Sequence, residues 1–329
     1  MKNFLMAGAV VLSAGLSGTA AFAQSTTVPG EQVGLAVGAP LPEGVYAIDT
    51  FVYRAPDGPV STSPVDVSVN VPVLVWSTPY VPFGGRIELL VAAPTVFAFG
   101  RNGGPTGIRD TSINVGTLLG GVWAFDLGGN FGVSFLGAVH LNELDGDRGV
   151  LVTNNGTVAS RAVLPQLASN TYRVGFAASY TGDGYNLTAN LTYNFYDTPS
   201  RFDGRGSSLG PINISDALLL DLTATKKFDL FNEGKPKFEI GAIGYGVTNL
   251  SPNLVSIPSI GSNQVGRGGY FAIGGLIGYD FGSFTAQAYV ARYVVESVGV
   301  QPATEGWFRV IVPLYTPPKV EPAAIVRKF

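Results

Sequence analysis

A period-two alternation of apolar and polar residues is the feature that most constrains this chain. In the segment 185–195, every odd position is apolar or aromatic and every even position is Asn or Thr. Successive side chains of a β-strand point to opposite faces, whereas a helix repeats every 3.6 residues. The segment therefore predicts a strand with one apolar and one polar face. In another segment, Val occupies every odd position from 65 to 75.

The same alternation recurs along the chain and predicts twelve strands. We expect them at 44–54, 65–76, 85–94, 115–127, 130–142, 171–181, 184–196, 216–228, 236–249, 269–281, 283–295 and 306–315. Connections after the even-numbered strands are mostly tight, as at Gly128-Gly129 and Gly182-Asp183. Those after the odd-numbered strands are long and polar, at 55–64, 95–114, 143–170, 197–215, 250–268 and 296–305.

This rhythm of short and long connections indicates an architecture. Outer-membrane barrels combine an even strand number with short periplasmic turns and long outer loops, and closure leaves no unpaired strand edge in lipid. We therefore predict an all-β fold, a transmembrane antiparallel up-and-down β-barrel of about twelve strands, over residues 44–315. The apolar stripe of each strand would face lipid. A secreted, soluble all-β domain is the alternative.

The ends of the chain carry their own signals. Residues 1–23 predict a secretory signal peptide, since Lys2 precedes an apolar stretch and Ala21-Phe22-Ala23 forms a cleavage site; a membrane anchor is the alternative. We assign 24–43 to an N-terminal periplasmic segment and 316–329 to a C-terminal tail that ends in Phe329. The expected location is the outer membrane of a Gram-negative bacterium.

Composition excludes several classes of chemistry. The chain has no Cys, which removes disulfides, thiolate metal sites and Cys nucleophiles, and its net charge of -3 offers no basic surface for nucleic acid. The single His, His140, could form a lipase-like set with Ser134 and Asn142, but nothing in the sequence orients such a pair. The acidic turn 145–147 lacks the calcium-loop pattern. We expect no enzyme activity, cofactor or metal.

Several charged or titratable residues share the strand face opposite the apolar stripe. A Lys or Arg on the lipid face is costly, so these side chains should line the lumen. The lumen-lining candidates are Arg86, Glu88, His140, Arg173, Asp221, Lys227, Glu239 and Arg309. They could pair with one another and brace a narrow barrel, or they could orient a permeating solute.

Four stretches of the sequence are similar to one known family. The phrases at 41–46, 217–228, 275–282 and 306–314 resemble the phenol meta-degradation protein family, and the resemblance extends over about 30–315. It implies an outer-membrane transporter-like barrel, of a kind often associated with the degradation of aromatic compounds. It implies no set of functional residues.

The function that follows is uptake of small hydrophobic or aromatic compounds, linked to aromatic degradation. Apolar residues near the strand ends, such as Trp76 and Phe97, favour it, and 143–170 is long enough to fold inward as a plug. The expected partners are outer-membrane lipid and a small apolar or aromatic solute, with the oligomeric state left open. A general diffusion porin, a structural or adhesive surface barrel and an outer-membrane hydrolase are the alternatives.

Overall fold

The structure is a computed structural model of the chain. The residues it describes are 27–57, 65–100, 110–114, 116–141, 170–196, 212–213, 215–230, 236–251, 253–257, 261–265, 268–297 and 300–318. The signal peptide expected at 1–23, the inward-folding segment expected within 143–170 and most of the tail lie outside these residues and stay predictions. Within the described residues, no helix is long and apolar enough to cross a membrane.

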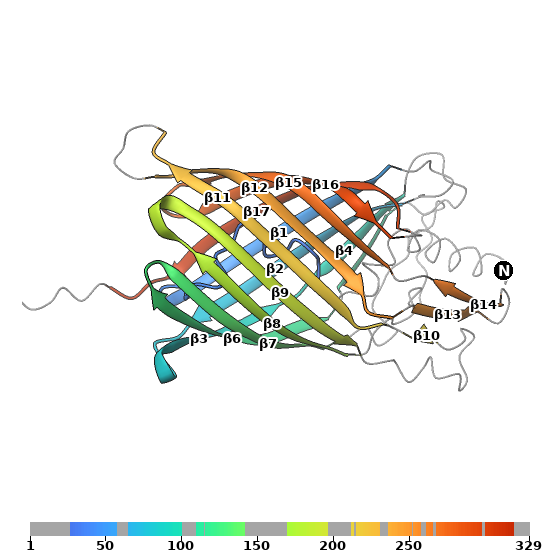
Figure 1. The fold of residues 1–329 in the computed structure, drawn as a ribbon, viewed down its shortest axis with the longest axis horizontal. Coiled ribbons are helices and arrows are strands. Elements are labelled where there is room, and N and C mark those ends of the chain that lie inside the picture. The colour runs from blue at the N-terminus through green and yellow to red at the C-terminus, as the bar shows by residue number, and fades with distance from the viewer. Residues whose placement is uncertain are drawn as a thin grey trace, which may run out of the picture.

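Twelve antiparallel strands form a closed barrel (Figure 1). They are β1 (Gly44–Pro56), β2 (Val65–Ser77), β3 (Gly85–Ala92), β6 (Thr117–Gly128), β7 (Phe131–Leu141), β8 (Asn170–Tyr180), β9 (Tyr185–Tyr196), β11 (Ala217–Phe228), β12 (Phe238–Asn249), β15 (Gly269–Asp280), β16 (Thr285–Glu296) and β17 (Ala303–Tyr315). Each strand pairs with its neighbours in chain order, and β1 closes the ring by pairing with both β2 and β17. The predicted all-β barrel of twelve strands is confirmed.

One connection expected to be a long loop contains strands. The segment 95–114 includes β4 (Thr95–Gly100) and β5 (Asp110–Asn114), which pair with each other, and β4 also continues the ladder along β2. The break between β3 and β4 falls at Pro94, which has no N–H to donate to a ladder. Three further short strands, β10 (Ile212–Asn213), β13 (Asn253–Ile257) and β14 (Gly261–Val265), form a separate small sheet.

The barrel has two different ends. At the short-turn end, connections such as η1 (Pro82–Gly84) and η2 (Gly182–Gly184) join neighbouring strands, while the small sheet of β10, β13 and β14 lies at the opposite end, which we call the long-connection end (Figure 1). Asp183 in η2 adopts a φ of 54°, and Gly128 and Gly129 have φ values of 79° and 61°. Left-handed backbone of this kind closes tight hairpins with the twist that strands require.

Strand β9 follows the alternation that its sequence predicts. Leu187, Leu191 and Phe195 are exposed on the outer wall, with 44% of the Leu191 surface accessible. Their neighbours Asn190 and Asn194 are buried inside, at 5% and 0%. The outer wall of this strand is therefore apolar where lipid would contact it.

Strand β2 contradicts the expectation that the apolar stripe faces lipid. Its valines Val69, Val71 and Val75 are buried in the barrel interior, whereas Leu74 and Trp76 are exposed outside. Both faces of this strand are apolar near its C-terminal end, so alternation alone could not orient it. The valines of β2 can face inward because apolar side chains pack against one another in the barrel interior.

We expect Leu191→Arg to destabilise the inserted barrel by about 2–4 kcal/mol, because it places a charge on the lipid face near the middle of β9. The matched control is Phe195→Arg, one residue from the strand end, which should cost only about 0–1 kcal/mol. Urea titration of protein inserted in lipid vesicles measures both. Equal losses for the two variants would contradict the assignment of this face to lipid.

Candidate functional site: the luminal segment and the wall that holds it

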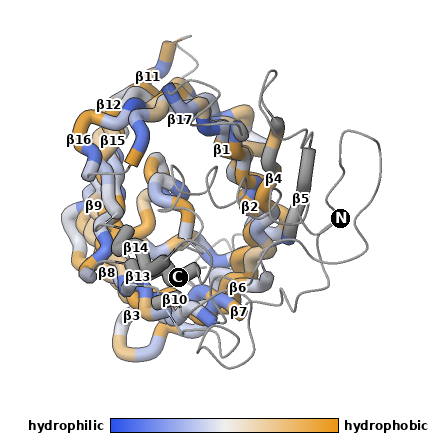
Figure 2. Tube along the Cα trace, turned by 90° about the vertical axis from the view of Figure 1, so that its right-hand side faces the viewer, coloured by the Kyte–Doolittle hydropathy of each residue, from blue (hydrophilic) through white to orange (hydrophobic). Residues whose placement is uncertain are grey.

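The barrel interior contains the chain's own N-terminal stretch. Residues 27–43, which we call the luminal segment, run inside the ring of strands (Figure 2). Thr27 lies against Asn194, toward the long-connection end of β9, and Leu41 lies against Glu88, near the short-turn start of β3. The segment thus passes along much of the lumen. The sequence predicts an N-terminal periplasmic segment at 24–43, and in the structure wall side chains bind the backbone of its described part.

Glycines spaced four residues apart bring the segment close to the wall. The backbone N–H of Gly30 donates to Asp221 (2.9 Å), that of Gly34 to Thr223 (2.8 Å) and that of Gly38 to Ser179 (2.9 Å). An irregular backbone inside a barrel must find partners for its polar groups. The inward hydroxyl and carboxylate side chains supply those partners.

The glycines also allow a conformation and a proximity that other residues would resist. Gly30 and Gly34 have φ values of 91° and 82°, within a run of turns in which the N–H of Glu31 and of Val33 bonds the carbonyl three residues earlier. At Gly38 the constraint is space, since a Cβ there would lie 2.5 Å from the backbone nitrogen of Ser179. The segment therefore fits only with glycine at these positions.

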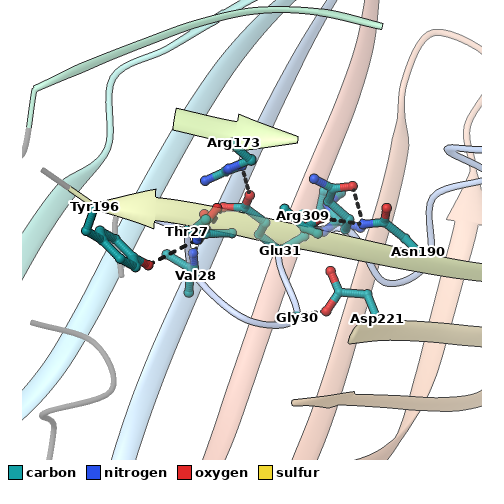
Figure 3. A network of polar contacts seen from close by, with 12 residues as sticks. Thr27, Val28, Gly30, Glu31, Arg173, Asn190, Tyr196, Asp221 and Arg309 are labelled. Carbon is teal, nitrogen blue, oxygen red and sulfur yellow. Dashed lines mark hydrogen bonds and ion pairs between the residues drawn. The ribbon is translucent and has the colours of Figure 1, made fainter. Parts of the chain in front are cut away.

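Arg309 holds the middle of the luminal segment. Its guanidinium donates to the carbonyls of Glu31 and Val33 and, on the wall, to Thr50 at 2.9 Å. The side chain is fully buried. Hydrogen bonds from a charged donor are roughly twice as strong as neutral ones, so Arg309 is a principal anchor of the segment (Figure 3).

Side chains of the segment make a second set of contacts with β8 and β9. Glu31 forms an ion pair with Arg173 at 2.7 Å (Figure 3). Gln32 accepts a hydrogen bond from Asn190 at 2.7 Å, and Thr27 accepts one from Asn194 at 2.8 Å. These contacts tie residues more than 140 positions apart in the chain, and they oppose removal of the segment from the lumen.

The other lumen-lining candidates lie in several environments. Glu88 accepts the N–H of Leu41 at 2.7 Å, and Glu239 accepts from Gln287 at 3.0 Å. Arg86 and Lys227 are partly exposed near the short-turn end. The structure brings Arg173, Asp221 and Arg309 together around the luminal segment, and it leaves Arg86 and Lys227 away from it.

Ser134 and His140 make no hydrogen bond with each other. The hydroxyl of Ser134 donates to the carbonyl of Val37 at 2.7 Å, and neither ring nitrogen of His140 has a partner within the described part of the chain. Asn142 lies outside the described residues. Among the described residues, no three His, Asp or Glu side chains converge to hold a metal ion.

A second group of buried residues lies on the wall in the long-connection half. This Glu305 cluster consists of Arg54, Tyr245, Tyr270, Tyr293, Glu305 and Trp307. Arg54 pairs with Glu305, whose carboxylate also accepts the hydroxyls of Tyr245 and Tyr293. The rings of Tyr270 and Tyr293 stack with centroids 4.0 Å apart. The cluster therefore combines a neutralised charge pair with a largely aromatic surface.

Sequence analysis missed the luminal segment and the Glu305 cluster. A signal for the segment was present, because glycines at 30, 34 and 38 repeat with a constant spacing inside a stretch that has only two charges. Alternation from Trp307 through Arg309 also continues backward to Glu305, but the last predicted strand began one residue later. Arg54 lay at the end of its predicted strand, where no alternation identified its face.

We expect Gly38→Ala to weaken the seating of the luminal segment, because the new methyl group must displace the backbone of β8 or the segment itself. The measurement is the rate at which a water-soluble maleimide labels a cysteine at position 36, which would be the only cysteine in the chain. Labelling should become several-fold faster. The matched control is Gly137→Ala, whose Cβ meets nothing within 4 Å; acceleration by both variants would contradict the close approach at Gly38.

One solved structure supports this architecture, and two others superpose less well. The COG4313 outer membrane channel from Pseudomonas putida F1 superposes with a TM-score of 0.60 at 13% identity, over 87% of this chain and 99% of that chain. A FadL homologue from Pseudomonas aeruginosa gives a TM-score of 0.44 at 12% identity, over 88% and 99% of the two chains. The β domain of the Bordetella autotransporter BrkA gives 0.46 at 11% identity, over 83% and 100%. No curated protein matches the sequence.

A family profile identifies the chain more directly. The profile described as "Putative MetA-pathway of phenol degradation" matches residues 53–301, which is most of the barrel. That agrees with the family that the four sequence phrases resemble. The superposition on the Pseudomonas putida channel adds that the fold is that of an outer-membrane channel. The chain therefore belongs to the family described as the putative MetA-pathway of phenol degradation.

Proposed function

We propose that this barrel takes up small hydrophobic or aromatic compounds across the outer membrane of a Gram-negative bacterium that degrades aromatic compounds. The observation that carries the proposal is the apolar and aromatic character of the interior. Inward-facing Val71, Tyr245, Leu276, Tyr289 and Trp307 are buried in one cluster. A channel for sugars or ions would need no such lining.

Physical chemistry supports this choice of solute. An apolar molecule gains about 25 cal/mol for each Å² of surface that it removes from water. A sugar or an ion gains little from the same lining and loses hydration. The rings of Tyr289 and Trp307 stack with centroids 5.1 Å apart, and both are buried against the luminal segment at Gly30. A shift of the segment would expose these rings to an aromatic solute.

The luminal segment fits selective passage better than free diffusion. It occupies the lumen of a barrel with only twelve strands, whereas water-filled porins have 16–18 strands. Polar side chains on β9 bind the segment, so its seating depends on hydrogen bonds that a solute or water could replace. We infer that transport requires the segment to shift within the lumen.

The test combines two measurements on the full chain. Liposomes containing the protein should admit phenol or toluene several-fold faster than empty liposomes when corrected for lipid permeation, and they should admit arabinose poorly. A deletion strain should grow slowly on limiting aromatic substrate and recover when the gene is restored. Rapid, unselective sugar entry with unchanged growth on aromatics would support a general diffusion porin and refute the proposal.

A further inference from the structure

Four buried polar side chains in the lumen share an unusual property, and we call them the polar quartet. They are His140 on β7, Thr171 and Arg173 on β8, and Asn194 on β9, each at most 5% exposed. Of the seven buried side-chain polar atoms without a hydrogen-bond partner among the described residues, five belong to this quartet. They are Nδ1 and Nε2 of His140, Oγ1 of Thr171, Nε of Arg173 and Oδ1 of Asn194.

The register of the strands brings the quartet together. His140 lies directly opposite Thr171, and Arg173 lies directly opposite Asn194. Residues opposite each other in an antiparallel pair have Cβ atoms about 4.5–5.5 Å apart. Thr171 and Arg173 are two residues apart on the same face of β8. The four side chains therefore form one patch on the lumen wall.

The borders of the patch are largely carbon surface, apart from the hydroxyl of Tyr196, which accepts a hydrogen bond from the amide of Asn194 at 3.1 Å. Leu118 of β6 is the partner of His140 on one side, and Tyr196 of β9 is the partner of Thr171 on the other. Both are buried. Ala138, opposite Arg173, adds a small apolar side chain on that side. The patch thus offers polar groups at its centre and carbon surface at its edges.

The unpartnered atoms specify the chemistry of a ligand. Nε of Arg173, the protonated nitrogen of His140 and the hydroxyl of Thr171 are donors, and Oδ1 of Asn194 is an acceptor. Buried polar groups in proteins are nearly always bonded, so this set calls for a partner. A carboxylate can accept from the donors, and a hydroxyl on the same molecule can donate to Asn194.

The luminal segment already places a carboxylate on this patch. Glu31 binds Nη1 of Arg173 at 2.7 Å, while Nε of the same guanidinium has no partner (Figure 3). Thr27 likewise binds the amide nitrogen of Asn194, and the amide oxygen of Asn194 stays without a partner. The segment therefore binds some of the polar groups of the quartet. At Arg173 it does so through a carboxylate, which is the functional group that the remaining donors of the patch would bind.

We propose that the polar quartet is a binding site for small aromatic carboxylates, preferably hydroxylated ones, and that Glu31 of the luminal segment competes with them for Arg173. The inference that the ligand is aromatic rests on the proposed function and on the apolar borders of the patch. A bound carboxylate repels the Glu31 carboxylate beside it, so binding weakens a contact that holds the segment. The solute would then promote its own passage.

The experiment measures binding to the purified full-length protein in detergent by isothermal titration calorimetry. The probes are benzoate, 4-hydroxybenzoate and the neutral benzyl alcohol. We expect 4-hydroxybenzoate to bind more tightly than benzoate, and benzyl alcohol at least tenfold more weakly. Arg173→Gln should weaken benzoate binding at least tenfold, and Glu31→Gln should tighten it several-fold because the internal competitor loses its charge.

Two further variants keep the test decisive. Thr171→Val changes shape little and should weaken benzoate binding several-fold even if Arg173→Gln fails to fold. Val174→Ala lies next to Arg173 on the exposed outer face of β8 and should leave binding unchanged. Equal binding of benzoate and benzyl alcohol, no binding of any probe, or insensitivity to both Arg173→Gln and Thr171→Val would show that the quartet is satisfied by water alone and overturn the proposal.

The outcome is independent of the test of the proposed function. Loss of benzoate entry with unchanged entry of toluene in Arg173→Gln liposomes would support the quartet as a carboxylate site within a working channel. Failure of wild-type liposomes to admit neutral aromatics would refute the proposed function, but calorimetry would still decide whether the quartet binds carboxylates.

Discussion

Deletion of residues 27–41 is expected to open the barrel and raise its single-channel conductance several-fold in planar lipid bilayers. The segment lies in the lumen, and its contacts with the wall run mainly between its backbone and wall side chains, as at Gly30, Gly34 and Gly38. The closed ladder from β1 to β17 involves none of these residues. The barrel should therefore still assemble, with Asp221 and Arg309 hydrated in an open lumen.

The matched control fixes the segment instead of removing it. Because the chain has no cysteine, a Thr27→Cys, Asn194→Cys double variant introduces one pair where the native side chains lie 2.8 Å apart. Oxidation should join the two cysteines in a disulfide and hold the single-channel conductance at its low value. Reduction should release the segment and restore the conductance of the wild-type protein. An unchanged conductance in the deletion variant would show that something other than the luminal segment closes the lumen.

Arg54→Met is expected to cost about 3–5 kcal/mol of unfolding free energy, since it leaves the buried Glu305 carboxylate without its countercharge. Tyr245 and Tyr293 would still donate to that carboxylate, but neutral donors compensate a buried charge poorly. Urea titration of vesicle-inserted protein, with loss of the unboiled gel shift as a second readout, measures the change.

A double variant tests the cause of this loss. Arg54→Met combined with Glu305→Gln removes both charges, keeps one acceptor oxygen for a tyrosine hydroxyl and lets the other hydroxyl accept from the new amide nitrogen, so it should recover most of the lost stability. Recovery would assign the defect to an unpaired charge. A double variant as unstable as Arg54→Met alone would assign it to lost packing of the Arg54 side chain against Tyr270 and Tyr293 instead.

Local sequence predicted the strands because each one needs only its own alternation. In β9, polar and apolar residues alternate between opposite faces from Tyr185 to Phe195, and the structure follows that pattern until Tyr196, which is buried inside. The charged residues placed opposite the apolar stripe are inside the barrel for the same reason, as Arg173 and Asp221 show. β2 was oriented incorrectly because apolar side chains also pack in the interior, which makes valine an ambiguous marker of the outer face.

The sequence by itself determined the all-β class, the number of barrel strands and the alternation of short turns with long connections, since these depend on periodicity and on glycine at turns. Only the tertiary structure decided that residues 27–43 lie in the lumen. Their backbone partners, Ser179, Asp221 and Thr223 among them, come from strands far along the chain, and nothing local to the segment encodes those contacts. The polar quartet likewise exists only because the pairing of β7, β8 and β9 sets these three strands in register.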